Sequence, residues 1–255
     1  MSLEIKYAPK TLSEVIITDP TVRSMLDLYI NEGCKKPLLL HGPFGSGKTT
    51  IANLLPSAIE RIPAEDLIVT KLNSSEFKTV ADIRNTFTVS ENRFLYLIDQ
   101  SRFYVITNEL YLSINAGIAF RDILDDISKE TQVIITTNDP SQLDAGVVDR
   151  CNKLYVPRIT AQDWLPKALK IAASEGVSIN KQAMLDFLSA QLAFDPSIRN
   201  MMSEFELFIY AAKNNQTFQH HAASVLNANQ PKPASKKAAN AHAPVGVINP
   251  LAAIK

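Results

Sequence analysis

Residues 42–49 have the sequence Gly42-Pro43-Phe44-Gly45-Ser46-Gly47-Lys48-Thr49, which fits the phosphate-loop pattern G-x-x-x-x-G-K-[ST] at every fixed position. Residues 38–41 before this loop, Leu38-Leu39-Leu40-His41, predict a buried strand, and residues 50–55 after it predict a helix. A strand and a helix on either side are the setting in which such a loop binds a nucleoside triphosphate. An ordinary glycine-rich turn is the alternative, and it leaves both flanking elements unexplained.

Each residue type in this loop suits the binding of a triphosphate. Glycines allow the backbone to curl, so that successive N–H groups and the positive end of the helix face the phosphates. Lys48 is expected to reach the β- and γ-phosphates, and the Thr49 hydroxyl is expected to ligate Mg²⁺. The expected cofactors are therefore ATP and Mg²⁺, and the expected contacts of the nucleotide are Gly42, Gly45, Ser46, Gly47, Lys48, Thr49 and Thr50.

The composition is that of a globular protein without a charge bias. The chain has 255 residues, is 46% hydrophobic, and balances 26 basic residues against 26 acidic ones. A neutral chain does not attract nucleic acid as a whole, so any DNA contact must be local or shared among subunits. No apolar run approaches the roughly 20 residues that span a bilayer, and residues 1–9 lack the apolar segment of a signal peptide. We therefore expect no membrane partner and a cytoplasmic location, at a nucleoid or a viral replication site.

Apolar runs alternate with helical patterns as far as Pro157, which predicts an α/β fold with a parallel sheet between layers of helices. Beyond Pro157, three helical patterns separated by Gly176 and Pro196 predict a small all-α domain. After residue 214 the apolar periodicity is lost, which predicts a disordered tail. The expected domains are residues 1–157, 158–214 and 215–255. Besides 38–41, strands are expected at 67–69, 94–98, 103–106 and 133–135, and a helix at 114–127.

Three further stretches point to a family. Residues 6–16 read Lys6-Tyr7-Ala8-Pro9-Lys10-Thr11-Leu12-Ser13-Glu14-Val15-Ile16, Arg150 is followed by Cys151, and residues 169–179 follow a lid-like pattern. With the phosphate loop, they resemble AAA+ ATPases, and among these the small subunits of sliding-clamp loaders of the replication factor C and phage kind. The resemblance implies a P-loop AAA+ sheet followed by a helical lid. The expected tail stands where the family has its third helical domain, the collar, so we expect no collar in these 255 residues, and the compact size suits a phage.

The resemblance also implies roles for residues at the ends of the sheet unit. Tyr7, Pro9 and Ile16 match the segment that crosses the adenine pocket in this family. Arg150 matches the arginine finger, which completes the site of a neighbouring subunit and therefore implies an oligomer.

Two residues match the sensors of this family. Asn138 matches sensor 1, a polar side chain that orients the attacking water or touches the γ-phosphate. Its alternative is a residue that starts the turn Asn138-Asp139-Pro140. Arg199 matches sensor 2 in the lid, and a solvated arginine on a helix is the alternative there.

The Walker B motif departs from the family pattern. Loader subunits have Asp-Glu at the end of an apolar strand, whereas this chain has Asn108-Glu109 after residues 103–107. An amide accepts a hydrogen bond from water on Mg²⁺ but adds no charge, so metal binding and turnover should weaken. Glu109 remains as the base that polarises water. Asp99, which follows residues 94–98, is the alternative to this register.

Two arginines resemble positions that contact DNA in the family. Arg84 and Arg121 match helices that line the DNA channel of loaders, where they contact phosphates without reading bases. Asp122 stands where other loaders often have a second basic residue. A solvated arginine is the alternative at both positions.

These observations lead to a main expectation and to alternatives. The chain is expected to be an ATP-binding clamp-loader subunit and a slow ATPase, with a sliding clamp, other loader subunits and primed DNA as partners. The alternative is a scaffold that binds ATP, hardly hydrolyses it, and recruits a partner through its tail. A remodelling ATPase that acts on protein ranks last, because Phe77 is the one aromatic residue where a pore loop would lie.

Overall fold

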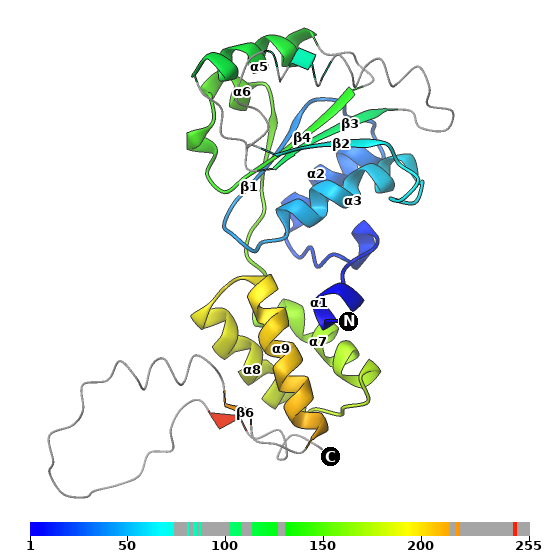
Figure 1. Ribbon diagram of the computed structural model, residues 1–255, viewed down its shortest axis with the longest axis vertical. Helices are drawn as coiled ribbons and strands as arrows, with labels where there is room; N and C mark the ends of the chain where they lie inside the picture. The colour runs from blue at the N-terminus through cyan, green and yellow to red at the C-terminus, as the bar shows by residue number, and fades with distance from the viewer. Residues whose placement is uncertain are drawn as a thin grey trace, which may run out of the picture. The chain divides into compact units, whose positions relative to one another are not determined.

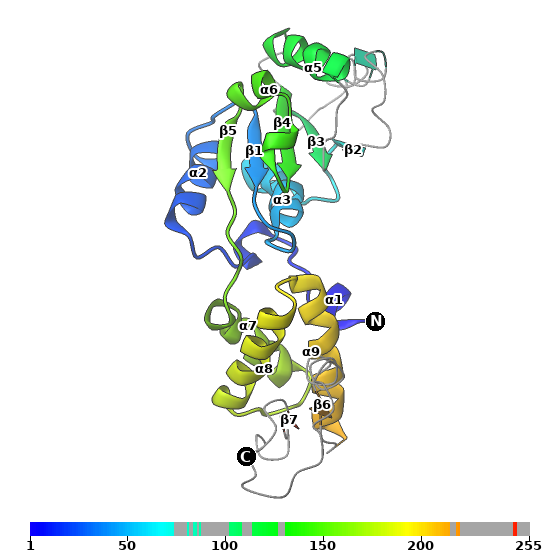
Figure 2. The same ribbon diagram turned by 90° about the vertical axis from the view of Figure 1, so that its left-hand side faces the viewer.

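The structure, a computed structural model, describes residues 1–73, 102–108, 114–126 and 131–214, single residues 81, 84, 85 and 87, and the pairs 218–219 and 247–248. The chain divides into two compact units, a sheet unit of Pro9–Arg158 and a helical unit of Met1–Ala8 with Ile159–Lys255 (Figures 1 and 2). The domain limits expected from the sequence stay predictions.

A parallel sheet forms the centre of the sheet unit (Figure 1). Its strands are β1 (Leu38–His41), β2 (Val69–Asn73), β3 (Phe103–Asn108), β4 (Thr131–Thr137) and β5 (Asn152–Tyr155). They lie in the order β2-β3-β4-β1-β5, and each pair is parallel. The predicted parallel α/β sheet is confirmed, although β2 begins later than expected, and the expected strand at 94–98 lies outside the described residues.

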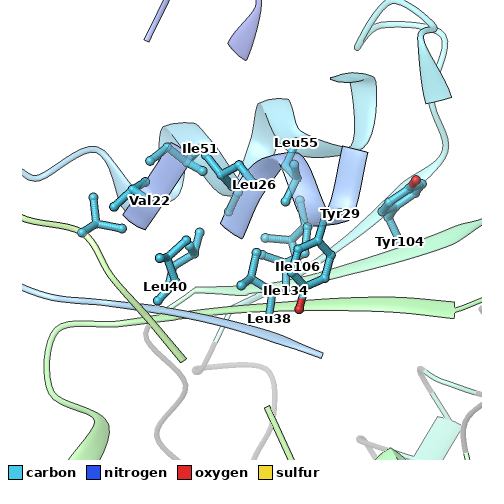
Figure 3. Packing of buried hydrophobic residues seen from close by; sticks show 13 residues of the cluster. Val22, Leu26, Tyr29, Leu38, Leu40, Ile51, Leu55, Tyr104, Ile106 and Ile134 are labelled. Atoms are coloured by element: carbon cyan, nitrogen blue, oxygen red, sulfur yellow. The ribbon is translucent and has the colours of Figure 1, made fainter. Parts of the chain in front are cut away.

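Helices cover both faces of this sheet. On one face lie α2 (Pro20–Ile30) and α3 (Lys48–Glu60), which pack on Leu38 and Leu40 of β1 (Figure 3). On the other face lie α5 (Ile114–Asp126) and the short α6 (Ala145–Asp149). Buried residues of these two helices form a second hydrophobic cluster that includes Leu39 of β1. Because alternate residues of a strand point to opposite faces, burial on both sides requires the continuous apolar run of β1. The short helical turns η1 (Leu12–Glu14) and η2 (Pro140–Gln142) lie in the connections.

The helical unit contains α1 (Leu3–Lys6), α7 (Ala161–Ser174), α8 (Lys181–Phe194) and α9 (Ile198–Lys213), so the predicted all-α lid is confirmed. Its core is aromatic: the rings of Phe187 and Phe208 stack at 4.5 Å, and Trp164 meets Phe205 edge-on at 5.7 Å. Beyond α9, β6 (Phe218–Gln219) pairs with β7 (Val247–Ile248) in antiparallel orientation. The rest of the expected tail, 215–255, lies outside the described residues. In the described part of the chain, no helix has the length and apolarity to cross a membrane.

Glu175 joins the N-terminal segment to the helical unit. It caps α7 at the C-terminal end, and its carboxylate accepts hydrogen bonds from Lys6 Nζ at 2.7 Å, Tyr7 Oη at 2.9 Å and Lys213 Nζ at 2.7 Å. These donors, Lys213 first, lower the pKa of Glu175 to about 2. The N–H of Leu3 adds a bond of 3.2 Å to Glu206. The segment that contains Tyr7 is thus part of the helical unit.

We predict that Glu175→Gln lowers the melting temperature at pH 7 by a few degrees, because it removes the charge that holds three donors. The folded-state pKa lies below the ordinary value of 4.5, so the stabilisation is complete above that pH and is lost as the pH falls towards about 2. Thermal unfolding of both proteins between pH 7 and pH 2 checks this. Glu204→Gln on α9, which makes none of these contacts, is the matched control. An unchanged difference in melting temperature across this pH range would contradict the prediction.

Candidate nucleotide-binding site

The phosphate loop connects β1 to α3 and depends on its glycines. Gly42, Gly45 and Gly47 have positive φ angles of 137°, 72° and 89°. A Cβ atom on Gly42 would lie 2.5 Å from the carbonyl oxygen of Val156, a distance that real Cβ atoms do not adopt. Gly47 directly precedes α3, so the unpaired N–H groups of the first helical turn border the loop. The loop therefore presents backbone donors and a helix N-terminus, which suit an anion.

Lys48 is buried within this loop. Its ammonium group donates to the carbonyl oxygens of Gly42 at 2.9 Å and Pro43 at 2.7 Å, and lies 3.5 Å from Ser46 Oγ. A positive charge thus occupies the centre of the loop, with Ser46 buried beside it. Thr49 is exposed and Thr50 half-buried in the first turn of α3. The seven residues expected to contact the nucleotide therefore lie in one continuous segment, which runs from the loop into the first turn of α3.

Two asparagines lie at the same edge of the sheet as the loop. Asn108 ends β3 level with Thr136 of β4, and Thr136 is in turn level with Leu40 of β1. Asn138 is half-buried and follows the last residue of β4. Carboxyl ends of parallel strands meet at one edge, where α/β sheets bind ligands. The side chain of Asn108 and the whole of Glu109 and Asp99 lie outside the described residues.

His41 is a neighbour of the loop that sequence reasoning missed. It ends β1 in register with Thr137 and Tyr155, and its ring centroid lies 5.5 Å from that of Tyr155. Burial, followed by the charges of Lys153 and Lys48, lowers the pKa of His41 below its ordinary value. The imidazole is therefore neutral at neutral pH and adds no positive charge to the loop. The sequence signal that could have identified His41 as a neighbour of the site is its position directly before Gly42.

Arg150 lies on the opposite face of the sheet from α2 and α3, at the C-terminal end of α6. Its Nε and Nη2 atoms donate to the two carboxylate oxygens of Asp125 on α5, at 2.7 and 2.6 Å. Its Nη1 donates to the carbonyl oxygen of Gly146 at 2.9 Å. The Arg150 guanidinium lowers the pKa of Asp125, and the Asp125 carboxylate raises that of Arg150. Sequence reasoning missed Asp125.

Arg121 also bridges α5 and α6. Its Nε lies 3.2 Å from Asp144 Oδ1, in an ion pair without hydrogen-bond geometry. Asp144 caps α6 by accepting from the N–H groups of Gly146 and Val147. A Cβ on Gly146 would lie 2.2 Å from Arg121 Cδ, so the arginine packs directly over this glycine. In this chain Arg121 therefore has a structural contact in addition to any role with DNA.

The remaining candidates are distributed over both units. Tyr7 and Arg199 belong to the helical unit, and Pro9 and Ile16 belong to the sheet unit, where both are half-buried. Arg199 lies in the first turn of α9, is 81% exposed, and has Glu4 at 3.6 Å. Arg84 is exposed, in a stretch of which few residues are described.

Comparisons with known proteins agree with this geometry. Residues 38–158 match the family described as "ATPase family associated with various cellular activities (AAA)". Human replication factor C subunit 5 is 24% identical over 187 residues, which cover 70% of this chain and 52% of the relative. Replication factor C subunit 4 of Caenorhabditis elegans is 28% identical over 185 residues, 69% of this chain and 54% of the relative. The chain thus spans about half the length of these curated relatives.

Among solved structures, a mutant of Thermotoga maritima RuvB superposes with a TM-score of 0.62 at 15% identity, covering 87% of this chain and 68% of that one. At this identity the likeness concerns the fold alone. The strand order and the phosphate loop show a P-loop α/β fold, residues 38–158 match the model of the AAA family, and replication factor C subunits are similar to the chain in sequence.

Proposed function

We propose that this chain is an ATP-binding AAA+ subunit of a DNA-replication sliding-clamp loader. The observation that supports nucleotide binding is the buried Lys48 ammonium at the centre of a loop with three left-handed glycines. The observation that supports the loader is the similarity to replication factor C subunits over about 70% of the chain. ATP binding and slow hydrolysis would be coupled to opening of the clamp and to its loading on primed DNA.

The described residues fit a triphosphate and Mg²⁺. Phosphate oxygens could replace the carbonyl oxygens that Lys48 contacts and would be charged acceptors for its ammonium group, and backbone N–H groups supply further donors. The exposed Thr49 hydroxyl in the first turn of α3 is free of the core and suits a metal ligand. Tyr7, Pro9 and Ile16 would contact the base, and Asn138 and Arg199 would respond to the γ-phosphate.

Hydrolysis requires a metal ion and a polarised water. Asn108 at the end of β3 would contact Mg²⁺ or its water as a neutral ligand, and Glu109 would act as the base. Arg150 would stabilise the transition state in a neighbouring subunit, an effect of about 10³- to 10⁵-fold in other nucleoside triphosphatases. The neutral Asn108 should make this turnover slow.

The proposed partners follow from the same comparison. A clamp, further loader subunits and primed DNA are the partners we propose, with Arg84 and Arg121 as phosphate contacts. A second candidate is an ATP-dependent scaffold that hardly hydrolyses ATP and uses its tail to recruit a partner. Asn108 in β3 is the observation that favours it, because an uncharged residue there weakens hydrolysis more than binding.

The loader proposal is tested by measuring ATP turnover with and without primed duplex DNA and the sliding clamp from the same source. We expect several-fold stimulation that requires both and falls as salt increases, since phosphate contacts release counterions. Unprimed single strands are the control. An ATP turnover rate that neither DNA nor the clamp changes would contradict the loader proposal. Tight ATP binding with negligible turnover under all conditions would favour the scaffold.

We predict that Lys48→Ala weakens ATP binding by roughly 10- to 100-fold, because a charged hydrogen-bond donor to phosphate is lost. Titration of a fluorescent ATP analogue measures this affinity. Lys153→Ala removes an exposed lysine from β5 in the same unit and should bind the analogue normally. Equal affinity of the Lys48 variant and the wild type would show that the loop is not the nucleotide site.

We also predict that Asn108→Asp increases ATP turnover by roughly 10-fold and lowers the Mg²⁺ concentration needed, because a charged ligand replaces a neutral one. Turnover at a series of Mg²⁺ concentrations checks this. Asn138→Asp adds the same charge at the end of β4 and should not lower the Mg²⁺ requirement. If the Asn108 variant shows an unaltered Mg²⁺ dependence, Asn108 does not occupy the Walker B position.

A further inference from the structure

Asp125 holds the Arg150 side chain in a defined way. The carboxylate pairs with the Nε side of the guanidinium through Nε and Nη2, at 2.7 and 2.6 Å, while Nη1 donates to Gly146. An arginine has five N–H donors, so these contacts use three and leave one on each terminal nitrogen. The Arg150 side chain remains 34% exposed. The pairing therefore orients the guanidinium without covering it.

The backbone around this pair is also suited to holding it in place. Gly146 supplies the third acceptor of Arg150, and its missing side chain leaves room for Arg121, which packs against it from α5. Gly117 on α5 similarly lies close to Asp144, since a Cβ there would be 3.0 Å from Asp144 Cβ. Two small residues thus let α5 approach α6, and the approach brings Asp125 within reach of Arg150.

We propose that Asp125 is a positioning residue for Arg150: it fixes the guanidinium so that its remaining N–H donors face the γ-phosphate bound by a neighbouring subunit. This inference rests on the proposed function, because it requires Arg150 to act in trans. A flexible arginine on an exposed surface would have to be ordered at the moment of reaction, and a bidentate carboxylate removes that requirement. The opposite role, in which Asp125 withholds Arg150 from the neighbouring site, predicts that Asp125→Asn raises the restored hydrolysis rate instead of lowering it.

The test uses two versions of the full chain that complement each other. The donor carries Lys48→Ala and supplies Arg150, and the acceptor carries Arg150→Ala and supplies the phosphate loop. Hydrolysis of radiolabelled ATP by the mixture is measured under single-turnover conditions, because these conditions allow slow rates to be measured. Hydrolysis that is restored by mixing shows that Arg150 acts in trans. If mixing restores nothing, the trans role in the proposed function fails, and the positioning role fails with it.

Asp125→Asn is then added to the donor only. We expect the restored rate to fall about 10-fold, as for a misplaced catalytic group, while ATP affinity of the acceptor stays unchanged. Asp126→Asn in the donor removes the same charge from the next residue, which makes none of the Arg150 contacts, and should leave the rate unchanged. A rate that is unchanged or increased by Asp125→Asn, with complementation intact, would overturn the positioning role alone.

A second measurement does not depend on hydrolysis. In the full-length wild type, the Nε–H proton of Arg150 should give a slowly exchanging, downfield NMR signal, because it is bonded to a carboxylate. Asp125→Asn should remove this signal and Asp126→Asn should keep it. A signal that is absent from the wild type, or that survives Asp125→Asn, would show that the pair does not form in solution and would overturn the proposal.

Discussion

Burial of β1 on both faces and along both edges is the constraint on which the site depends. Leu38, Leu39 and Leu40 are fully buried, and β4 and β5 pair with the strand on either side. A strand enclosed in this way ends at a fixed height in the sheet, so the loop that follows begins at a fixed point. Gly42 is in contact with the chain after β5, where any side chain would collide with Val156. The position of the phosphate loop is therefore set by the core rather than by the loop itself.

Much of this arrangement could be predicted from local sequence. The apolar runs of β1, β3 and β4 and the helical spacing of α5 are properties of neighbouring residues, and each was predicted within a few positions. The short β5 was not predicted, because Asn152, Lys153 and Tyr155 are polar or partly exposed and Leu154 alone is buried. Its place in the sheet comes from pairing with β1, and this is a tertiary property.

The charged contacts were beyond prediction for the same reason. Asp125 and Arg150 are 25 positions apart, and Tyr7 and Glu175 are 168 positions apart, so no local sequence pattern predicts either contact. Residues expected to act on ligands, Tyr7 and Arg150, were identified by family motifs, whereas the carboxylates that hold them were not. A motif indicates which side chain acts, but its orientation depends on packing between elements that are distant in sequence.

The ion pairs between α5 and α6 show how a neutral chain can still have locally strong electrostatics. Arg121 and Asp125 lie one turn apart on α5, and they face Asp144 at the start of α6 and Arg150 at its end. An acid at the N-terminal end and a base at the C-terminal end also agree with the direction of the helix dipole. Each helix contributes one charge of each sign, so the interface is neutral overall while both arginines are held. Since both arginines are candidates for contacts outside the subunit, a phosphate that reached either of them would lie beside a carboxylate of this chain and would use the N–H donors that the carboxylate leaves. The balanced charges therefore orient the two side chains without adding a net positive charge that would attract anions from a distance.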